Sequence, residues 1–262
     1  MAQDRITFGA PPLDEVTIGR QFLHRSDFLI PHFGTFWEKV RGQLPKVAHA
    51  APIVEANGAS AVEEFALMPR VWLLSADETR LVQLQQDRFH YNWRRRGERA
   101  TYIRFDSVLA EGLSYWNTLD ALFKDETGKG LQATRAELTY VNFLEIEGVS
   151  STIEIMERSL KDFAWNSKNR HLQSPKGAVH NVSFDVPSIG GLLIVNAATA
   201  TRGSSKVKGV KLDLTVRGKC DDQQSFEDWA RQAHDFLVAA FVDLTTAEMH
   251  KIWRMEERPH GQ

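Results

Sequence analysis

The stretch FHYNWRRRGER, residues 89–99, combines aromatic and basic side chains at unusual density. Arginines neutralise phosphate groups and aromatic rings stack on bases, so this combination is typical of nucleic-acid binding. Aromatic and arginine side chains also contribute strongly to protein–protein interfaces. A third interpretation is an ordinary strand end followed by a solvated turn. The candidate binding residues in this stretch are Tyr91, Trp93, Arg94, Arg95, Arg96 and Arg99.

A second basic group lies on or beside a predicted strand in the C-terminal half of the chain. Its candidate binding residues are Lys206, Lys208, Lys211 and Arg217. If the two halves are related, both groups belong to comparable strands and lie on neighbouring sheet surfaces. Acidic residues are interspersed with both groups, and the net charge is −2 with an isoelectric point near 6.5. This balance argues against wholesale electrostatic binding to nucleic acid or an anionic membrane, but not against a local patch.

The sequence contains no recognisable catalytic or metal-binding motif. No two of its nine histidines are spaced as in a zinc-binding helix, and its single cysteine, Cys220, excludes both a Cys/His cluster and an intramolecular disulfide. Nucleophile-elbow, Walker A and dinucleotide-binding motifs are absent. Glu145 and Glu147 share a predicted strand face, but a solvated face explains them better than acid–base chemistry. We therefore predict no catalytic residue, no metal and no cofactor.

The N-terminal residues lack the basic region and apolar run of a signal peptide. No apolar run approaches the roughly 20 residues that a membrane-spanning helix needs. A protein of the cytoplasm without a membrane partner is the expectation.

Hydrophobic periodicity in the first half predicts the order strand, helix, three strands, helix. The expected segments are a strand at 14–22, a helix at 26–44, a loop at 46–60, strands at 63–68, 70–76 and 80–93, and a helix from Asp106 to Phe123. The last strand is expected to run unbroken through its Gln-Gln-Asp centre. Gln83, Gln85 and Asp87 would then share a face with Phe89 and Tyr91, unless a bulge resets the alternation.

The second half repeats this order. The expected segments are a strand at 135–147, a short helix capped by Ser151, a loop at 166–177, strands at 178–186, 191–201 and 206–218, a long helix from Ser225, and a final helix from Thr245. The sequence therefore predicts an α+β fold with halves 1–130 and 131–262 in one compact unit. TBP-like or helix-grip-like halves, with sheets side by side and helices on one face, are the first expectation, and two ferredoxin-like units are the alternative.

Three segments carry a resemblance to a known family. PPLDEVTIGRQF, RVWLLSADETRLVQLQQDRFHYNWR and FVDLTTAEMHKIW resemble a sporadically distributed bacterial family of uncharacterised proteins of about this length. The resemblance covers nearly the whole chain, although the family usually shows Tyr-Pro where this chain has Tyr102 and Ile103. It implies a signature of Gln83, Gln85, Asp87, Arg88, Phe89 and Asn92, together with Trp93.

The signature has two physical interpretations. Asp87, Arg88 and Asn92 could form an internal hydrogen-bond network that fixes the helix at 106–123 to its sheet. Alternatively, Tyr91, Trp93 and the arginines form an exposed recognition surface.

The resemblance implies no enzymatic activity, and the family's sporadic occurrence resembles that of accessory genes, including conflict and toxin-neutralising systems. We expect a non-enzymatic binding protein of a bacterial accessory system that recognises a protein partner through a sheet or loop surface. The alternatives are a nucleic-acid-binding protein that uses the basic strands, and a small-ligand binder or enzyme with a pocket between sheet and helix. Homo-oligomerisation is left open.

Overall fold

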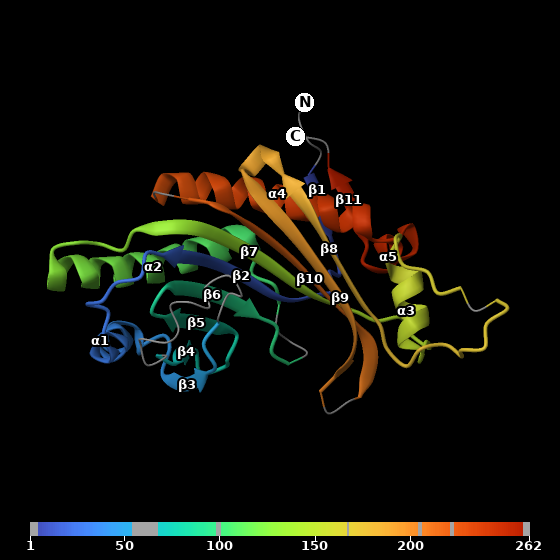
Figure 1. Ribbon diagram of the computed structural model, residues 1–262, viewed down its shortest axis with the longest axis horizontal. Coiled ribbons are helices and arrows are strands. Elements are labelled where there is room, and N and C mark those ends of the chain that lie inside the picture. The colour runs from blue at the N-terminus through green and yellow to red at the C-terminus, as the bar shows by residue number, and fades with distance from the viewer. Residues whose placement is uncertain are drawn as a thin grey trace. The chain divides into compact units, whose positions relative to one another are not determined.

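The structure, a computed structural model, describes residues 5–53, 68–97, 101–166, 168–203, 206–220 and 223–258. These residues form five α-helices and eleven β-strands, so the predicted α+β class is confirmed (Figure 1). The helices are α1 (Ile30–Val40), α2 (Phe105–Thr127), α3 (Thr152–Ser159), α4 (Gln223–Leu244) and α5 (Ala247–Ile252). The strands are β1 (Arg5–Phe8), β2 (Leu13–Phe22), β3 (Lys46–Ala50), β4 (Arg70–Leu74), β5 (Arg80–Gln85), β6 (Arg88–Arg94), β7 (Ala133–Leu144), β8 (Val179–Val186), β9 (Gly191–Arg202), β10 (Val207–Lys219) and β11 (Met255–Arg258).

The chain divides into two compact units, each assembled from separate stretches of sequence. Unit 1 comprises Met1–Asp14, Thr139–Val216 and Arg231–Gln262, and unit 2 comprises Glu15–Leu138 and Arg217–Ala230. The predicted halves, 1–130 and 131–262, divide the sequence at one point, whereas these units are interleaved along it.

Unit 2 contains an antiparallel sheet in the strand order β3-β4-β5-β6-β2, with the first part of β7 beside β2. Helix α2 packs on β6 and also contacts α1. The apolar stripe predicted for this helix is confirmed, because Val108, Leu109 and Trp116 are buried. Asp106 was the N-cap predicted from the sequence, but the N-cap is Arg104, so the helix begins two residues earlier than that cap implies and without a side-chain cap.

The prediction of a single strand at 80–93 is wrong. Gln86 and Asp87 form a turn that separates β5 from β6, and the two strands pair as a hairpin in which Gln85 lies opposite Arg88. Opposed residues of an antiparallel pair point to the same face. Gln83 and Gln85 therefore share a face with Arg88, His90 and Asn92, and the aromatic residues of β6 point to the other face.

Other boundaries also differ from the expectations. Residues 46–50, predicted as loop, form β3 because their backbone pairs with β4. Helix α1 is shorter than the predicted segment at 26–44, since residues 26–29 form a turn and an extended N-cap before Pro31. Ser151 caps α3 as predicted, whereas α5 is capped by Thr246 and not by Thr245. The strand predicted at 63–68 lies almost entirely outside the described residues.

Two glycines allow the layers of unit 2 to approach closely. A Cβ at Gly112 of α2 would lie 2.2 Å from Cδ1 of Ile18 on β2. A Cβ at Gly19 of β2 would lie 2.0 Å from Cδ2 of His90 on β6. The first contact brings the helix onto one sheet face, and the second lets the His90 ring lie over the backbone on the opposite face.

A buried cation lies in the interior of unit 2. The guanidinium of Arg20 lies 3.8 Å from the ring centroid of Phe226 and 4.5 Å from that of Trp116. Burial lowers the pKa of Arg20 to about 10, against the opposing effect of nearby acidic groups. Cation–π contacts offset part of the cost of removing this charge from water.

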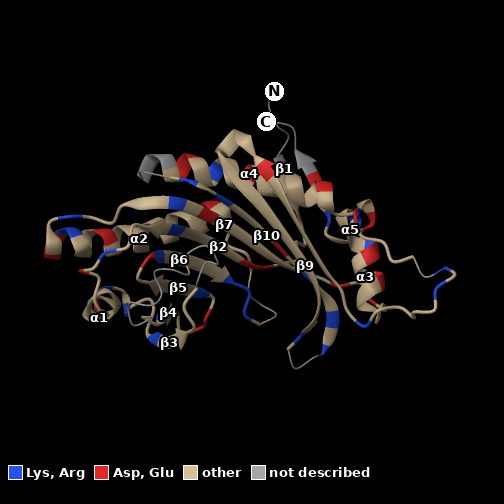
Figure 2. Cartoon of the chain, viewed as in Figure 1, with Lys and Arg blue, Asp and Glu red and all other residues tan. Residues whose placement is uncertain are grey.

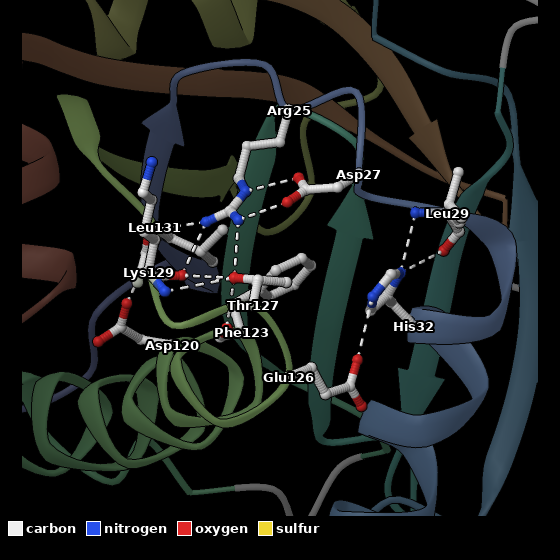
Figure 3. Close-up of polar contacts among 11 residues, drawn as sticks. Arg25, Asp27, Leu29, His32, Asp120, Phe123, Glu126, Thr127, Lys129 and Leu131 are labelled. Atoms are coloured by element: carbon white, nitrogen blue, oxygen red, sulfur yellow. Dashed lines mark hydrogen bonds and ion pairs between the residues drawn. The ribbon is translucent and has the colours of Figure 1, made fainter.

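Arg25 joins the β2–α1 connection to the C-terminal end of α2 (Figure 3). Its guanidinium donates two hydrogen bonds to Asp27, at 2.8 and 2.7 Å, and one at 2.8 Å to Oγ1 of Thr127. It also donates to the carbonyl oxygens of Lys129 and Gly130 at 2.8 and 2.9 Å. A cation that binds carbonyls beyond a helix C-terminus is favourably placed for the helix dipole.

Unit 1 contains strands in the order β7-β10-β9-β8, with β7 and β10 contributing the parts of their length that belong to this unit. Strands β8 and β9 form an antiparallel hairpin that turns through a 3₁₀ helix at Pro187–Ile189 (Figure 1). Strand β1 pairs with β11, and Phe8 packs edge-on against Phe241. No helix among the described residues combines the length and the apolar character that crossing a membrane requires.

The contacts of the glycines predict opposite effects of the same substitution in two helices. Gly112→Ala is expected to lower the free energy of unfolding by about 1–3 kcal/mol, because the new methyl group overlaps Ile18. Gly34→Ala in α1 is the matched control: no atom lies within 4 Å of its added Cβ, so improved helix propensity should raise that free energy by about 0.5–1 kcal/mol. Urea denaturation of both variants measures the difference, and equal stabilisation by the two substitutions would contradict the close helix–strand approach.

Candidate binding sites

The aromatic residues of the arginine-rich stretch are not at the surface. Tyr91 and Trp93 are 0% and 1% exposed, on the face of β6 that α2 covers. The interpretation of these two rings as an exposed recognition surface is therefore wrong, since the hairpin turn directs both inward. Arg94 points to the opposite face and is 9% exposed.

The remaining basic candidates belong to several environments. Arg95 is half-buried, Arg96 is exposed, and Arg99 lies outside the described residues. Lys206 and Lys208 are exposed residues of unit 1. Basic (blue) and acidic (red) segments are interspersed along the chain (Figure 2). Two of the predicted binding residues form ion pairs with acidic residues. Those pairs are Lys211 with Asp213 and Arg217 with Glu137, each at 2.6 Å.

The signature amides and acids form a hydrogen-bond network on the sheet face opposite α2. Asn92 donates to Glu15 and Thr17 and accepts from Gln83 at 2.9 Å. The network joins β5, β6 and β2 side to side. The sequence interpretation that this network fixes α2 to the sheet is wrong, because the network lies on the face opposite α2.

The rest of the signature closes the β5–β6 turn. Gln85 donates to Asp87 at 3.1 Å and exchanges hydrogen bonds with the backbone of Ile53. Arg88 donates to both carboxylate oxygens of Asp87 at 3.1 and 3.0 Å. The Gln85 amide and the Arg88 guanidinium are therefore satisfied locally.

The contact between α2 and the sheet includes a polar cluster that sequence reasoning missed. Glu111 of α2 accepts a hydrogen bond from the Tyr91 hydroxyl and a two-pronged pair from Arg80, with Nε at 2.8 Å. Burial and the Glu111 carboxylate raise the pKa of Tyr91, and hydrogen bonds from Arg80 and Tyr91 hold the pKa of Glu111 below its ordinary value despite partial burial. A phenol with a raised pKa keeps its proton, which suits a structural donor better than a general base.

His90 is a buried titratable group on the polar face. Nε2 of its ring lies 3.7 Å from Glu137, yet its pKa lies below the ordinary value, because burial outweighs that carboxylate. The positive charges of Arg88, Arg70 and Arg217 lower it further. His90 is therefore a neutral packing residue at neutral pH.

The polar face carries a cluster of arginines around one indole. Trp72 of β4 lies with the guanidinium carbons of Arg70 and Arg94 at 5.7 and 5.9 Å from its ring centroid. Gln83 lies directly across from Trp72 on β5. Polar atoms of all four side chains are buried without a hydrogen-bond partner in the part of the chain that the structure describes.

Strand β8 is the last strand in the order of unit 1, and β9 is its one strand neighbour among the described residues. Its outer edge makes no backbone hydrogen bond to the described residues. Val179 and Phe184 on this strand are 66% and 45% exposed, and the strand carries one charge, Asp185, and no proline. Edge strands usually carry charges, prolines or bulges that prevent pairing with other chains, and β8 has little of this protection.

A small hollow lies between α2 and the strands of unit 2. Its volume is about 170 Å³, including space open to solvent. Arg20 is the one charged residue among the side chains that line it, which are otherwise apolar or glycine. The lining therefore lacks the convergent polar groups typical of a small-molecule site. No group of three or more metal-ligating side chains occurs in the described ranges.

Comparison with protein families found no family model that matches this chain. Comparison with curated proteins likewise found no match.

Burial of His90 predicts a specific pH dependence of stability. Because the pKa of His90 is lower in the folded protein than its ordinary 6.5, the unfolded chain binds the extra proton first, and stability falls as pH decreases below about 6.5. Free energies of unfolding at pH 7 and pH 5, from urea titrations, should fall by less in His90→Gln than in the wild type. The substitution should reduce the dependence of the free energy of unfolding on pH by at most about 1.4 kcal/mol per pH unit. An unchanged pH dependence would show that His90 titrates normally.

Proposed function

We propose that this protein is a non-enzymatic binding protein that recognises an extended segment of a partner protein along β8. One observation carries the proposal: β8 is an eight-residue edge strand with exposed apolar side chains and little protection against pairing. Addition of a strand from a partner uses main-chain hydrogen bonds for affinity and alternate side chains for specificity.

The backbone geometry of β8 supports this mode of binding. The amide of Thr199 donates to the carbonyl of Ala178 at 3.0 Å, so the backbone carbonyl of residue 178 points toward β9. The register continues without interruption from Val179 to Val186. Since hydrogen-bonding groups alternate along an antiparallel strand, the backbone groups of residues 179, 181, 183 and 185 point away from β9 and are available to a new strand.

Apolar side chains give the edge a basis for specificity. Phe184 and Val182 lie on one side of the strand, and Val179 lies on the other. A partner strand that carries β-branched or aromatic residues at alternate positions would pair with Phe184 across the edge. Such cross-strand pairs contribute about 0.2–1 kcal/mol each.

The wider setting rests on sequence. We place the activity in the cytoplasm and in a bacterial accessory system, because the chain resembles a sporadically distributed bacterial family. We also keep the proposal that the two halves are TBP-like or helix-grip-like repeats. The orders β2-α1-β4-β5-β6-α2 and β7-α3-β8-β9-β10-α4 support it, with β3 as an addition to the first half.

The alternative functions have less support. Nucleic-acid binding would lose the two predicted aromatic residues Tyr91 and Trp93, which are buried. A small-ligand site between sheet and helix would have Arg20 as its one charged group.

The proposal is tested by removing one outward N–H from β8. Ser183→Pro removes a donor that points away from β9, so the β8–β9 ladder is retained, and proline is tolerated at such positions of edge strands. Ser183→Ala removes the same side chain but keeps the N–H, and is the matched control. The tagged protein is purified gently from its own host, and co-purifying proteins are quantified by native mass spectrometry.

We expect a partner of fixed stoichiometry with the wild type and with Ser183→Ala. Its affinity for Ser183→Pro should be lower by about tenfold, which corresponds to about 1.4 kcal/mol. A photo-reactive residue in place of Asn181 should cross-link to that partner. Equal affinity for the proline and alanine variants, or cross-links confined to unit 2, would contradict recognition along β8.

A further inference from the structure

We propose that Arg70, Trp72 and Arg94 form a binding site for an oxyanion, the carboxylate or phosphate group of a ligand, on the polar face of unit 2. The site is separate from β8 in residues and in unit, so it stands or falls independently of the proposed function.

Strand register places the three side chains on one face of the sheet. Arg70 and Trp72 are two residues apart on β4 and therefore point to the same face. Trp72 is opposite Gln83, and Gln83 is opposite His90, so this row crosses β4, β5 and β6. Arg94 projects from β6 on the same face as His90. Both guanidinium groups lie near the indole ring, with their central carbons at 5.7 and 5.9 Å from its centroid.

One donor atom of each of the three side chains is buried. Nη1 of Arg94, Nε of Arg70 and Nε1 of Trp72 have no hydrogen-bond partner among the residues that the structure describes. Arg94 is only 9% exposed, so water has little access to its guanidinium as a hydrogen-bond partner. A buried donor without a partner destabilises the fold, and the effect is larger for a charged group. Three such donors around one ring mark a position where a bound acceptor would stabilise the fold.

The electrostatics favour an anion. Burial lowers the pKa of Arg70, and the positive charge of Arg88 lowers it further. The acidic groups of this face already accept from other donors: Asp87 from Arg88, Glu15 from Asn92, and Glu137 from Arg217. Glu15 is the cross-strand neighbour of Arg94 in the β2–β6 register. Arginine suits the planar or tetrahedral oxygens of carboxylate and phosphate, because its N–H groups form a rigid fork.

Gln83 adds a constraint on the ligand. Its Oε1 is a buried acceptor without a partner within the described ranges, while its Nε2 donates to Asn92 at 2.9 Å. A ligand that carries an N–H or O–H beside its oxyanion would satisfy this acceptor as well. The chemistry of the site therefore fits an amino acid, a hydroxy acid or a phosphate monoanion, and these share one oxyanion group with an adjacent donor.

Binding is tested on the full-length protein with two probes, inorganic phosphate and glutamate, each against sodium chloride at equal ionic strength. Thermal unfolding and isothermal titration calorimetry are expected to show saturable binding of at least one probe at millimolar concentration. Phosphate bound more tightly than glutamate assigns a phosphate ligand, and the reverse order assigns a carboxylate.

Two variants locate the site. Arg94→Gln should weaken binding of the probe by at least tenfold, because it removes the buried charge. Trp72→Phe keeps an aromatic ring but removes the indole N–H, and should weaken binding by a smaller factor while the fold is retained. Arg96→Gln, at an exposed arginine two residues along the chain, is the matched control and should bind as the wild type does.

The proposal is overturned if neither probe binds above the sodium chloride control. It is also overturned if both Arg94→Gln and Trp72→Phe, verified as folded by circular dichroism, retain wild-type affinity. Loss of partner recognition along β8 with anion binding intact would separate the two proposals.

Discussion

The two-residue turn at Gln86 and Asp87 determines where the side chains of β5 and β6 lie, and much of unit 2 depends on it. A hairpin places opposed residues on the same face, so this turn sends the aromatic residues of β6 toward α2 and sends Arg88, His90 and Asn92 to the opposite face. Asp87 then accepts from Arg88 and Gln85, which holds the turn closed. Shifting the register by one residue would exchange the two faces and bury the charges under the helix.

The α+β class, the buried stripe of α2 and the order of helices and strands could be predicted from the sequence, because each depends on local periodicity. The β5–β6 turn could not be predicted in this way. Gln-Gln-Asp-Arg lacks the Asn-Gly or Asp-Gly pair that signals a tight hairpin turn, and the apolar alternation on either side looks continuous. Strand β3 was missed for a related reason: KVAHA has only five residues, and its pairing with β4 is a tertiary contact.

The candidate sites show the same limit. Arg94 could be identified by its residue type, but Arg70, Trp72 and Gln83 join it only through the register of three strands. Tyr91 and Trp93 were identified for their type as well, and their burial depends on the face that the turn assigns to them. Residues 178–186 were predicted as a strand, yet their position at the edge depends on strand order, which a single sequence does not contain. Residue type thus indicates chemistry, and topology decides which side chains can use it.

The position of Phe226 has a consequence for how the chain matures during synthesis. Strands β2 to β6 and helix α2 all precede residue 128 in the chain, so a growing chain can form most of unit 2 early. Arg20 then has Trp116 beside it, whereas its nearer aromatic neighbour, Phe226, follows only near the end of translation. Until Phe226 is synthesised, this guanidinium lacks one of its two cation–π contacts, and the interior of the nascent unit is incomplete. A chain truncated before Phe226 would therefore be released with the buried charge of Arg20 incompletely covered.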